Sequence, residues 1–398
     1  MILPSRLSTR VSALATLARL TRIQPMPNAP SRREFIRAAS LASLTFAGSA
    51  LLRTLAQAEP PPPTATDRVL GVALLGLGSY SAGELAPALL QTRRCRLAGI
   101  ITGSAEKAAR WARKYNLPKK NLYHYNHLEQ IAGNPDIDIV YVVTPPALHP
   151  EFAIRAAKAG KHVISEKPMA CSVADCDAMI AACRDAGVKL SIGYRLHFDP
   201  YHQELVRLAG DSSFGPFNRM SGDFGFTMYG QQWRVEKRLA GGGPMMDLGI
   251  YVIHAACMAS GGVAPLAVTA HEEPKTRPEF FREVEETMRW TMEFPGGAVC
   301  TAVSSYSHQN NYFRAEGPHG WIEFPENAFA YRDIRCATSR GPVRFKPQVN
   351  QQARQMDDFA DCILSGRASP VPGELGRRDI RILSAIYEAA ATGRRVLV

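Results

Sequence analysis

The sequence of 398 residues predicts an α/β domain with a doubly wound parallel sheet, followed by an α+β domain built on an antiparallel sheet. Up to about residue 193, short apolar runs alternate with helical patterns, which is typical of parallel strands covered by helices. Beyond residue 194, polar and apolar residues alternate within runs that end at Gly or Pro, which favours antiparallel strands. The length supports about two domains with separate cores.

The first domain is expected at residues 69–193. Continuous apolar runs predict strands that are buried on both faces, and apolar residues at helical spacing predict the helices between them. The predicted strands are Leu70–Leu75, Cys95–Ile101, Ile137–Val143, Val163–Ser165 and Leu190–Ile192, and the predicted helices begin near Ser81 and cover 104–115, 148–159 and 172–186.

The second domain is expected at residues 194–375, with a terminal helix and tail at 376–398. The final helix, at about 376–391, has Ile380, Leu383 and Tyr387 on one face. The clearest strand patterns are Glu285–Phe294, Ala298–Ser304 and Trp321–Phe324.

The positive charge of the chain is concentrated in residues 1–58. They carry eight Arg, no Lys and one acid, Glu34, so they hold +7 of the formal net charge of +11. The remaining +4 is too weak a field to indicate nucleic-acid binding, and no basic stripe with interleaved aromatic residues is present. No nucleic-acid partner is therefore expected.

Residues 1–58 resemble a twin-arginine signal peptide, which an export machinery reads as an address. Arg32-Arg33 and Phe35 precede an apolar stretch, Ala38–Leu52, and Ala56-Gln57-Ala58 offers a small-x-small cleavage pattern. The stretch is about 15 residues long, whereas a membrane span needs about 20, so no stable membrane anchor is expected. An Arg-rich transit peptide or an unstructured tail is the alternative.

The mature protein is thus expected in the periplasm, exported in folded form by the twin-arginine machinery. Residues 59–68 include four consecutive prolines, Pro60 to Pro63, and are expected to form an extended arm ahead of the first domain.

Disulfides and metal sites are not expected. None of the eight Cys forms a C-x-x-C pair, and most lie in apolar segments where free buried thiols are common. His124 with His127, and His197 with His202, could begin metal sites, but neither pair has a third ligand at a recognisable spacing.

A glycine loop between the first predicted strand and helix indicates a dinucleotide site. Gly76-x-Gly78-x-x-Ser81 encloses Ser79 and Tyr80, and Ser81 stands where the third glycine is usual. Such a loop lets the backbone approach a pyrophosphate at the helix N-terminus. A tight turn without a ligand is the alternative.

The end of the second predicted strand favours NADP over NAD. NAD sites carry an acid there for the ribose hydroxyls. Here Thr102, Ser104 and Lys107 follow the strand instead, which suits a 2′-phosphate. Glu106 is a competing acid, but it is expected inside the next helix.

Three further motifs, taken in order behind this loop, resemble the Gfo/Idh/MocA oxidoreductases, and additional segments resemble the glucose–fructose oxidoreductase branch of that family. The three are Thr144-Pro145-x-x-x-His149, Glu166-Lys167-Pro168 and Gly241-Gly242-Gly243-x-x-x-Asp247-x-Gly249-x-Tyr251. The additional segments are Gln231-Gln232-Trp233-Arg234, Ser304-Ser305-Tyr306-Ser307 and Ala385–Ala390, together with the leader and the proline arm.

The resemblance implies an N-terminal Rossmann domain, a C-terminal domain with a large open sheet, and sugars as substrates. It implies that Lys167 contacts the nicotinamide ribose and the reacting hydroxyl, and that Asp247 and Tyr251 handle the proton. The open sheet of the family is often covered by a second subunit, so a homodimer or homotetramer is expected. His254 departs from the family, where Asp is common, and its role is open.

The chemistry of these residues fits the removal of hydride from a carbinol carbon, which needs a base for the hydroxyl proton. Asp247 and Tyr251 are spaced i, i+4 and project from one helix face. A free phenol has a pKa near 10, and a neighbouring ammonium favours its phenolate. We therefore expect Tyr251 to accept the proton, Lys167 to be its electrostatic partner, and Asp247 to orient Lys167 or substrate. An ordinary helix pair is the alternative.

The remaining motif residues are assigned to the cofactor. Arg195 follows the last strand of the first domain and could instead bind sugar hydroxyls or form a structural ion pair. The residues expected to bind the cofactor are Gly76, Gly78, Ser79, Tyr80, Thr102, Ser104, Lys107, Thr144, Pro145, His149, Glu166, Lys167, Arg195, Trp233 and Arg234.

Export sharpens the expected function, because an exported enzyme that released its NADP would stop after one turnover. We expect tightly bound NADP(H) and a ping-pong cycle, in which an aldose is oxidised at C1 to a lactone and a second sugar is reduced to a polyol. One alternative is an NADP-dependent aldose 1-dehydrogenase with exchangeable cofactor. The other is a non-catalytic sugar-binding protein.

Overall fold

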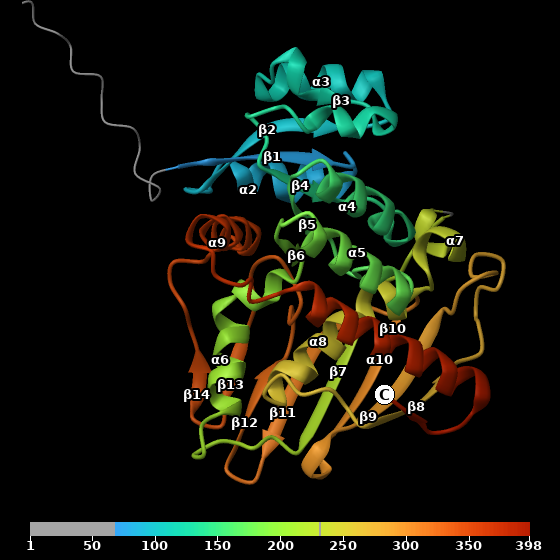
Figure 1. Ribbon diagram of the computed structural model, residues 1–398. Coiled ribbons are helices and arrows are strands. Elements are labelled where there is room, and N and C mark those ends of the chain that lie inside the picture. The colour runs from blue at the N-terminus through green and yellow to red at the C-terminus, as the bar shows by residue number, and fades with distance from the viewer. Residues whose placement is uncertain (1–67, 231) are drawn as a thin grey trace, which may run out of the picture. The chain divides into compact units, whose positions relative to one another are not determined.

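The computed structural model describes residues 68–230 and 232–398. The predictions for the signal peptide at 1–58 and for the proline arm at 59–68 lie outside these residues, apart from Arg68. Gln231 also lies outside them. The predicted fold class is confirmed: a parallel sheet is followed by a larger, mostly antiparallel sheet (Figure 1).

The first sheet has six parallel strands in the described part of the chain, in the order β3-β2-β1-β4-β5-β6. Every apolar run predicted for this domain forms a strand, because each run is long enough to cross a sheet whose two faces helices cover. The strands are β1 (Leu70–Leu75), β2 (Cys95–Ile101), β3 (Leu122–Tyr123), β4 (Ile139–Val142), β5 (His162–Ser165) and β6 (Leu190–Ile192).

Helices connect these strands and also lie close to their predicted ranges. The strand order reverses between β1 and β4, and ligands of doubly wound sheets bind in the crevice at such a point. The helices are η1 (Ser81–Leu85) continuing into α2 (Ala86–Leu89), α3 (Ala105–Tyr115), α4 (His149–Lys158) and α5 (Val173–Asp185), with short turns η2 (Lys119–Asn121), η3 (Tyr125–Ile131) and η4 (Pro146–Leu148).

The second sheet has nine strands in the described residues, in the order β14-β13-β12-β11-β7-β10-β9-β8-β15. Its neighbouring strands are antiparallel except for β7 and β10, which are parallel. The strands are β7 (Arg219–Gly225), β8 (Ala267–Glu272), β9 (Thr287–Glu293), β10 (Val299–Ser305), β11 (Asn310–Gly317), β12 (Gly320–Phe324), β13 (Cys336–Thr338), β14 (Gly341–Val343) and β15 (Val396–Leu397).

Helices cover one face of this sheet (Figure 1): α8 packs on β7 and β11, and α10 packs on β8. Helix α9 instead returns to the first domain, where it contacts α2 and β2. The helical elements of this half are η5 (Arg195–Phe198), α6 (Pro200–Ala209), η6 (Trp233–Val235), α7 (Lys237–Ala240), η7 (Met245–Gly249) continuing into α8 (Ile250–Ala259), η8 (Pro295–Gly297), α9 (Gln351–Ser365) and α10 (Gly373–Thr392).

The two faces of the nine-stranded sheet differ in polarity. Met288, Trp290 and Met292 of β9 are buried towards the helices, while Arg289 and Thr291 alternate with them on the other face. This outward face has a hollow of about 560 Å³ lined mainly by polar side chains from β7 to β11. The inward face therefore carries the core, and the outward face is a separate polar surface.

All eight cysteines are free thiols, and all except Cys171 are buried. None of the helices that the structure describes is long and apolar enough to span a membrane.

Candidate active site

A cavity of about 820 Å³ lies between the carboxyl ends of the parallel strands and the second domain. The loops that follow β1, β2, β4 and β5 line one side, and residues from η6 through α8 line the other. Its size suits a dinucleotide together with a small substrate.

The glycine loop forms the turn that the sequence predicts. Gly76 has a φ of +96°, and a Cβ there would lie 2.5 Å from the Val143 carbonyl oxygen, so no other residue fits. A Cβ at Gly78 would face open space. Ser81, in place of a third glycine, is fully buried and donates its hydroxyl to the Gly76 carbonyl at 2.5 Å. The serine therefore closes the turn rather than obstructing it.

The residues after β2 leave a polar corner without an acid. Thr102 and Lys107 line the cavity, whereas Ser104 caps α3 by accepting a hydrogen bond from the Lys107 backbone N–H at 3.2 Å. The competing acid, Glu106, is 87% exposed and pairs with Arg110 at 3.5 Å. The structure thus directs Glu106 away from the corner, where only neutral and basic groups remain.

Lys167, Asp247 and Tyr251 meet in the cavity as the motifs predict. The Lys167 ammonium lies 4.4 Å from the Tyr251 ring centroid. It donates to the Asp247 backbone carbonyl at 2.8 Å and contacts Asp247 Oδ1 at 3.3 Å. Asp247 and Tyr251 lie on one continuous helix, but Asp247 falls in its wide first turn, η7, and such π-turns are frequent at functional sites.

Two further side chains hold the Asp247 carboxylate. Arg234 Nε donates to Oδ2 at 3.0 Å, and the Tyr306 hydroxyl donates to the same oxygen at 3.1 Å. Burial raises the pKa of Asp247, but Lys167 and Arg234 outweigh it and hold the pKa below its usual value. Burial lowers the pKa of Lys167, but Tyr251 and Asp247 raise it by a larger amount. The pKa therefore lies above its usual value, and Lys167 remains a charged ammonium. The site therefore carries a fixed ion-pair network beside the Tyr251 ring.

A buried carboxylate fixes the start of the helix that carries Asp247 and Tyr251. Glu285 accepts the backbone N–H groups of Gly243 at 2.9 Å and Met245 at 3.0 Å, and also the Tyr387 hydroxyl at 2.9 Å. A Cβ at Gly243 would lie 2.4 Å from the Glu285 carbonyl oxygen. The Glu285 carboxylate thus links the glycine motif at the start of this helix to Tyr387 of α10.

Glu166 lines the cavity next to Lys167, and its carboxylate accepts the Tyr141 hydroxyl at 2.7 Å. Gln355 of α9 donates to the same hydroxyl at 2.9 Å. Burial raises the pKa of Glu166 despite the opposing hydrogen bond from Tyr141 and the charge of Lys167. Glu166 therefore connects the site to α9 as well as to the first sheet.

His149 does not line the cavity, in contrast to its expected contact with the cofactor. It is 1% exposed, and its ring nitrogens lie 2.8 Å from the Thr144 carbonyl and 3.0 Å from the Pro168 carbonyl. Burial lowers the pKa of His149 to about 4. The imidazole thus connects the loop that carries Thr144 with the loop that carries Lys167. It supports the cavity wall from the side that faces away from the cavity.

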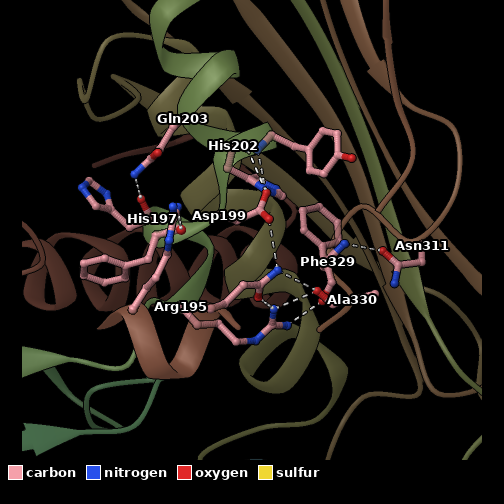
Figure 2. A network of polar contacts seen from close by, with 12 residues as sticks. Arg195, His197, Asp199, His202, Gln203, Asn311, Phe329 and Ala330 are labelled. Atoms are coloured by element: carbon pink, nitrogen blue, oxygen red, sulfur yellow. Dashed lines mark hydrogen bonds and ion pairs between the residues drawn. The ribbon is translucent and has the colours of Figure 1, made fainter. Parts of the chain in front are cut away.

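Arg195 lines the cavity, and its guanidinium is bonded to protein groups (Figure 2). Its guanidinium donates to the carbonyls of Phe329 at 2.5 Å and Ala330 at 3.0 Å, and to the Gln351 side chain at 2.5 Å. The same group lies 5.1 Å from the Tyr251 ring centroid. Arg195 thus bonds backbone carbonyls rather than the acid that the ion-pair alternative requires. These bonds anchor a loop beside Tyr251.

Trp233 and His254, two further residues named from the sequence, differ in their position relative to the cavity. Trp233, expected at the cofactor, lines the cavity with Arg234 stacked on its ring at 4.4 Å. His254, whose role was open, is buried beneath the site, 3.2 Å from Asp379 and stacked on Tyr194. The predicted residues that line the cavity are Gly76, Gly78, Ser79, Tyr80, Thr102, Lys107, Thr144, Pro145, Glu166, Lys167, Arg195, Trp233, Arg234, Asp247 and Tyr251.

Sequence reasoning missed one wall of the cavity. Tyr331 and Arg332 come from the segment between β12 and β13, and Asn311 comes from β11. No motif marks them, because they reach the site through the pairing of distant strands. Tyr306 stood in a motif, but only its contact with Asp247 reveals its place. In the described residues, no cluster of three or more His, Cys, Asp or Glu could hold a metal ion.

The fold and the site together define a nicotinamide-dinucleotide oxidoreductase of the two-domain type. Residues 70–194 match the family model described as the oxidoreductase family with an NAD-binding Rossmann fold, and residues 202–323 match the GFO/IDH/MocA C-terminal domain. The chain belongs to the Gfo/Idh/MocA oxidoreductase family, as the motifs predicted.

Relatives with sugar substrates in their names are among the similar proteins. A D-xylose 1-dehydrogenase [NADP(+)] of Haloarcula marismortui is 26% identical over 83% of this chain and 93% of its own length. A trans-1,2-dihydrobenzene-1,2-diol dehydrogenase of Xenopus tropicalis is 30% identical over 74% of this chain and 88% of its own. The crystal structure of aldose–aldose oxidoreductase from Caulobacter crescentus, complexed with glycerol, is 42% identical, with a TM-score of 0.81 over 83% of this chain and all of that one.

Proposed function

We propose that this protein is an NADP(H)-dependent sugar oxidoreductase that oxidises an aldose at C1 to a lactone and reduces a second sugar to a polyol in the same site. The observation that carries the proposal is the Lys167 ammonium over the Tyr251 ring, in the cavity that also contains the Gly76–Ser81 loop. The named substrates of the Caulobacter and Haloarcula relatives support a sugar as the substrate class.

The residues present fit NADP. The Gly76–Gly78 turn leaves space for a pyrophosphate, Lys107 faces a corner without an acid, and Thr144 Oγ1 is buried with no partner in the described protein. Gly76, Gly78 and Ser79 would hold the pyrophosphate, Thr102 and Lys107 the 2′-phosphate, and Thr144 and Lys167 the nicotinamide ribose. When bound, NADP supplies the nicotinamide carbon that takes up a hydride and returns it.

Tyr251 is the group that moves the proton. Its phenolate form accepts the proton of the C1 hydroxyl, and the Lys167 ammonium stabilises the negative charge of that phenolate. The Asp247 carboxylate pairs with both the Lys167 ammonium and the Arg234 guanidinium, so it fixes the two cations beside Tyr251.

The second half of the cycle reverses these roles. Tyr251, now protonated, donates to the carbonyl oxygen of the second sugar as that carbon gains a hydride. The first sugar thus loses one hydride and one proton, and the second gains both. Tight retention of NADP(H) lets this cycle run with no cofactor supply in the periplasm.

A single-substrate NADP-dependent aldose 1-dehydrogenase is the second candidate, and the xylose 1-dehydrogenase relatives favour it. It uses the same proton transfer but exchanges its cofactor after each turnover. The two candidates differ only in whether NADPH leaves the site before the next sugar enters.

The deciding experiment is an absorbance spectrum of the purified protein with no added nucleotide. The proposal expects a band at about 340 nm, that of the reduced nicotinamide, to rise on adding glucose and to fall on adding fructose or another aldose. A protein that arrives empty and turns over only with added NADP establishes the dehydrogenase instead. A protein that binds sugar but never develops the band leaves only the non-catalytic alternative.

We also propose that the chain is exported to the periplasm by the twin-arginine route, on the strength of Arg32-Arg33 and Phe35. Replacing both arginines, R32K with R33K, should remove the protein from the periplasmic fraction of a bacterial host and leave it in the cytoplasm. The matched control is R19K with R22K, which changes two leader arginines outside the motif. Equal export of both variants contradicts the proposal.

The outward face of the nine-stranded sheet is the proposed contact between subunits of a homodimer or homotetramer. The family resemblance supports it, and so does the hollow on this face, to which Arg289, Thr291 and Tyr312 contribute. Light scattering at micromolar concentration tests it: a monomer contradicts the proposal, and a dimer that T291R converts to a monomer supports it.

A further inference from the structure

The segment that connects β12 to β13, residues 325–335, crosses from the second domain to the dinucleotide loop of the first. We call it the crossing segment. Its middle is buried: Ala328 is 0% and Phe329 is 1% exposed. Its tip is not, since Tyr331 is 37% exposed and the Arg332 side chain is 60% exposed. Tyr331 and Arg332 nevertheless line the cavity, so they lie at its rim.

The second domain fixes the base of the crossing segment from two sides (Figure 2). Asn311 accepts the Phe329 backbone N–H at 2.7 Å through its side chain, and the Ala328 N–H at 3.1 Å through its backbone. From the opposite side, Arg195 donates to the carbonyls of Phe329 and Ala330. Because the backbone of the crossing segment is bonded on both sides at residues 328–330, the position of its tip, Tyr331 and Arg332, is fixed.

The tip contacts the first domain directly beside the glycine loop. The Tyr331 ring stacks on Tyr80, with centroids 5.8 Å apart and planes inclined by 30°. Arg332 Nη2 donates to both carboxylate oxygens of Glu84 in η1, at 2.7 and 2.8 Å. Tyr80 lies within the Gly76–Ser81 loop that would hold the pyrophosphate, and Glu84 lies in η1, the first helical turn that follows the loop.

We propose that Tyr331 and Arg332, with Tyr80 and Glu84, form a latch across the rim of the cavity that slows the release of the dinucleotide. The inference rests on the proposed NADP site. A dinucleotide in the Gly76–Ser81 loop lies beneath the bridge that these four side chains make, so it leaves after the bridge opens. All four residues of the latch lie in the described part of the chain.

The test measures the rate at which bound NADPH leaves when excess NADP is added, followed by the loss of its fluorescence in a stopped-flow instrument. R332Q should release NADPH about fivefold faster than the wild type, the most that an exposed ion pair supports. E84Q should give the same increase, and the double variant should give no more than either one, because each substitution breaks the same pair.

The matched control is R335Q. Arg335 lies in the crossing segment and pairs with Glu326 of the same segment at 2.5 Å, both well exposed, so it does not bridge to the first domain. R335Q should release NADPH at the wild-type rate. Thermal unfolding midpoints equal to the wild type in all four variants show that the change is local.

The results that overturn the latch are of two kinds, those that reject the latch alone and one that also rejects the proposed function. If wild type binds NADPH and R332Q releases it at the wild-type rate, the latch alone is wrong. Additive effects in the double variant, or an equal effect of R335Q, likewise reject the pair as the cause. If the wild type binds no NADPH, the proposed function fails and the latch fails with it.

Discussion

At the dinucleotide end of the cavity, the glycine loop, Thr102 and Thr144 each lie within a few positions of the end of a parallel strand, whereas the catalytic end draws on segments that are far apart in the sequence. Thr102 directly follows β2, and Thr144 lies two residues after β4. Asp247, in contrast, is bonded by Lys167, Arg234 and Tyr306.

This difference determines what a substitution does at each end. The dinucleotide end is made of loops with few internal charge pairs, so a change there alters one contact with the cofactor. At the catalytic end, Lys167 and Arg234 both pair with Asp247. Replacing any one of the three therefore also affects the other two and, through them, the proposed proton transfer. Three predictions test this contrast.

The largest effect is expected at the catalytic end from Y251F. Removal of the hydroxyl that carries the proton should lower kcat for sugar oxidation by about 10²–10⁴-fold, while the amount of bound NADP is unchanged. Steady-state rates and the nucleotide content of the purified variant check this. Y312F, on the outward face of β11, is the control and should be as active as the wild type. Unchanged turnover in Y251F would remove Tyr251 from the mechanism.

An intermediate effect is expected from His149, which supports the dinucleotide end from behind. Its pKa is lowered by burial to about 4, whereas an unfolded histidine titrates near 6.5, so between these values the unfolded chain binds one more proton. Stability should therefore fall as the pH falls, by about 2 kcal/mol between pH 7 and pH 5 from this residue, and be independent of it above pH 7.

Urea unfolding at pH 7 and pH 5 measures this loss. In H149N the fall should be smaller by that amount, while H319N, which changes an exposed histidine, should behave as the wild type. An equal fall in wild type and H149N would mean that folding does not lower the pKa of His149.

The smallest effect is expected from K107A. Loss of one exposed charge-assisted contact with the 2′-phosphate should weaken NADP about tenfold relative to NAD and leave kcat with saturating cofactor unchanged. Binding titrations with both nucleotides check this. K114A, at the other end of α3, is the matched control. Equal loss of NADP and NAD binding would place Lys107 on the pyrophosphate rather than on the 2′-phosphate.

The same contrast explains how much of the molecule the sequence predicts. Five of the six described strands of the first sheet are predicted within two residues, because a strand that is buried on both faces has a continuous apolar run in the sequence. The sixth, β3, was not predicted; it has only two residues. In the second sheet only β9, β10 and β12 were named from the sequence, and β7, β8, β11, β13, β14 and β15 were missed. Strands β7 and β11 are polar, glycine-containing segments in which only alternate residues such as Met220 and Phe313 are buried. Helix α9 was missed because Gln351, Gln352 and Gln355 occupy buried positions that apolar residues usually fill.

For the site, local motifs identified Lys167, Asp247 and Tyr251, because each stands in a short pattern with its own physical requirement. Tyr306 stands in a quoted segment and Arg195 follows the last strand of the first domain, but their contacts depend on the register of β10 and on the position of the crossing segment. Tyr331 and Arg332 carry no signal in the sequence. Contacts that depend on the pairing of distant strands cannot be read from a single chain without its structure.

The two edges of the nine-stranded sheet have a consequence for how the protein behaves at high concentration. At one edge, β14 has only three residues and includes Pro342, which has no N–H to offer a neighbouring strand. At the other, the two-residue strand β15 lies against β8. Unpaired edges invite other chains to add strands and grow fibres. With both edges blunted in this way, the sheet offers little free backbone to which a strand of another copy could add.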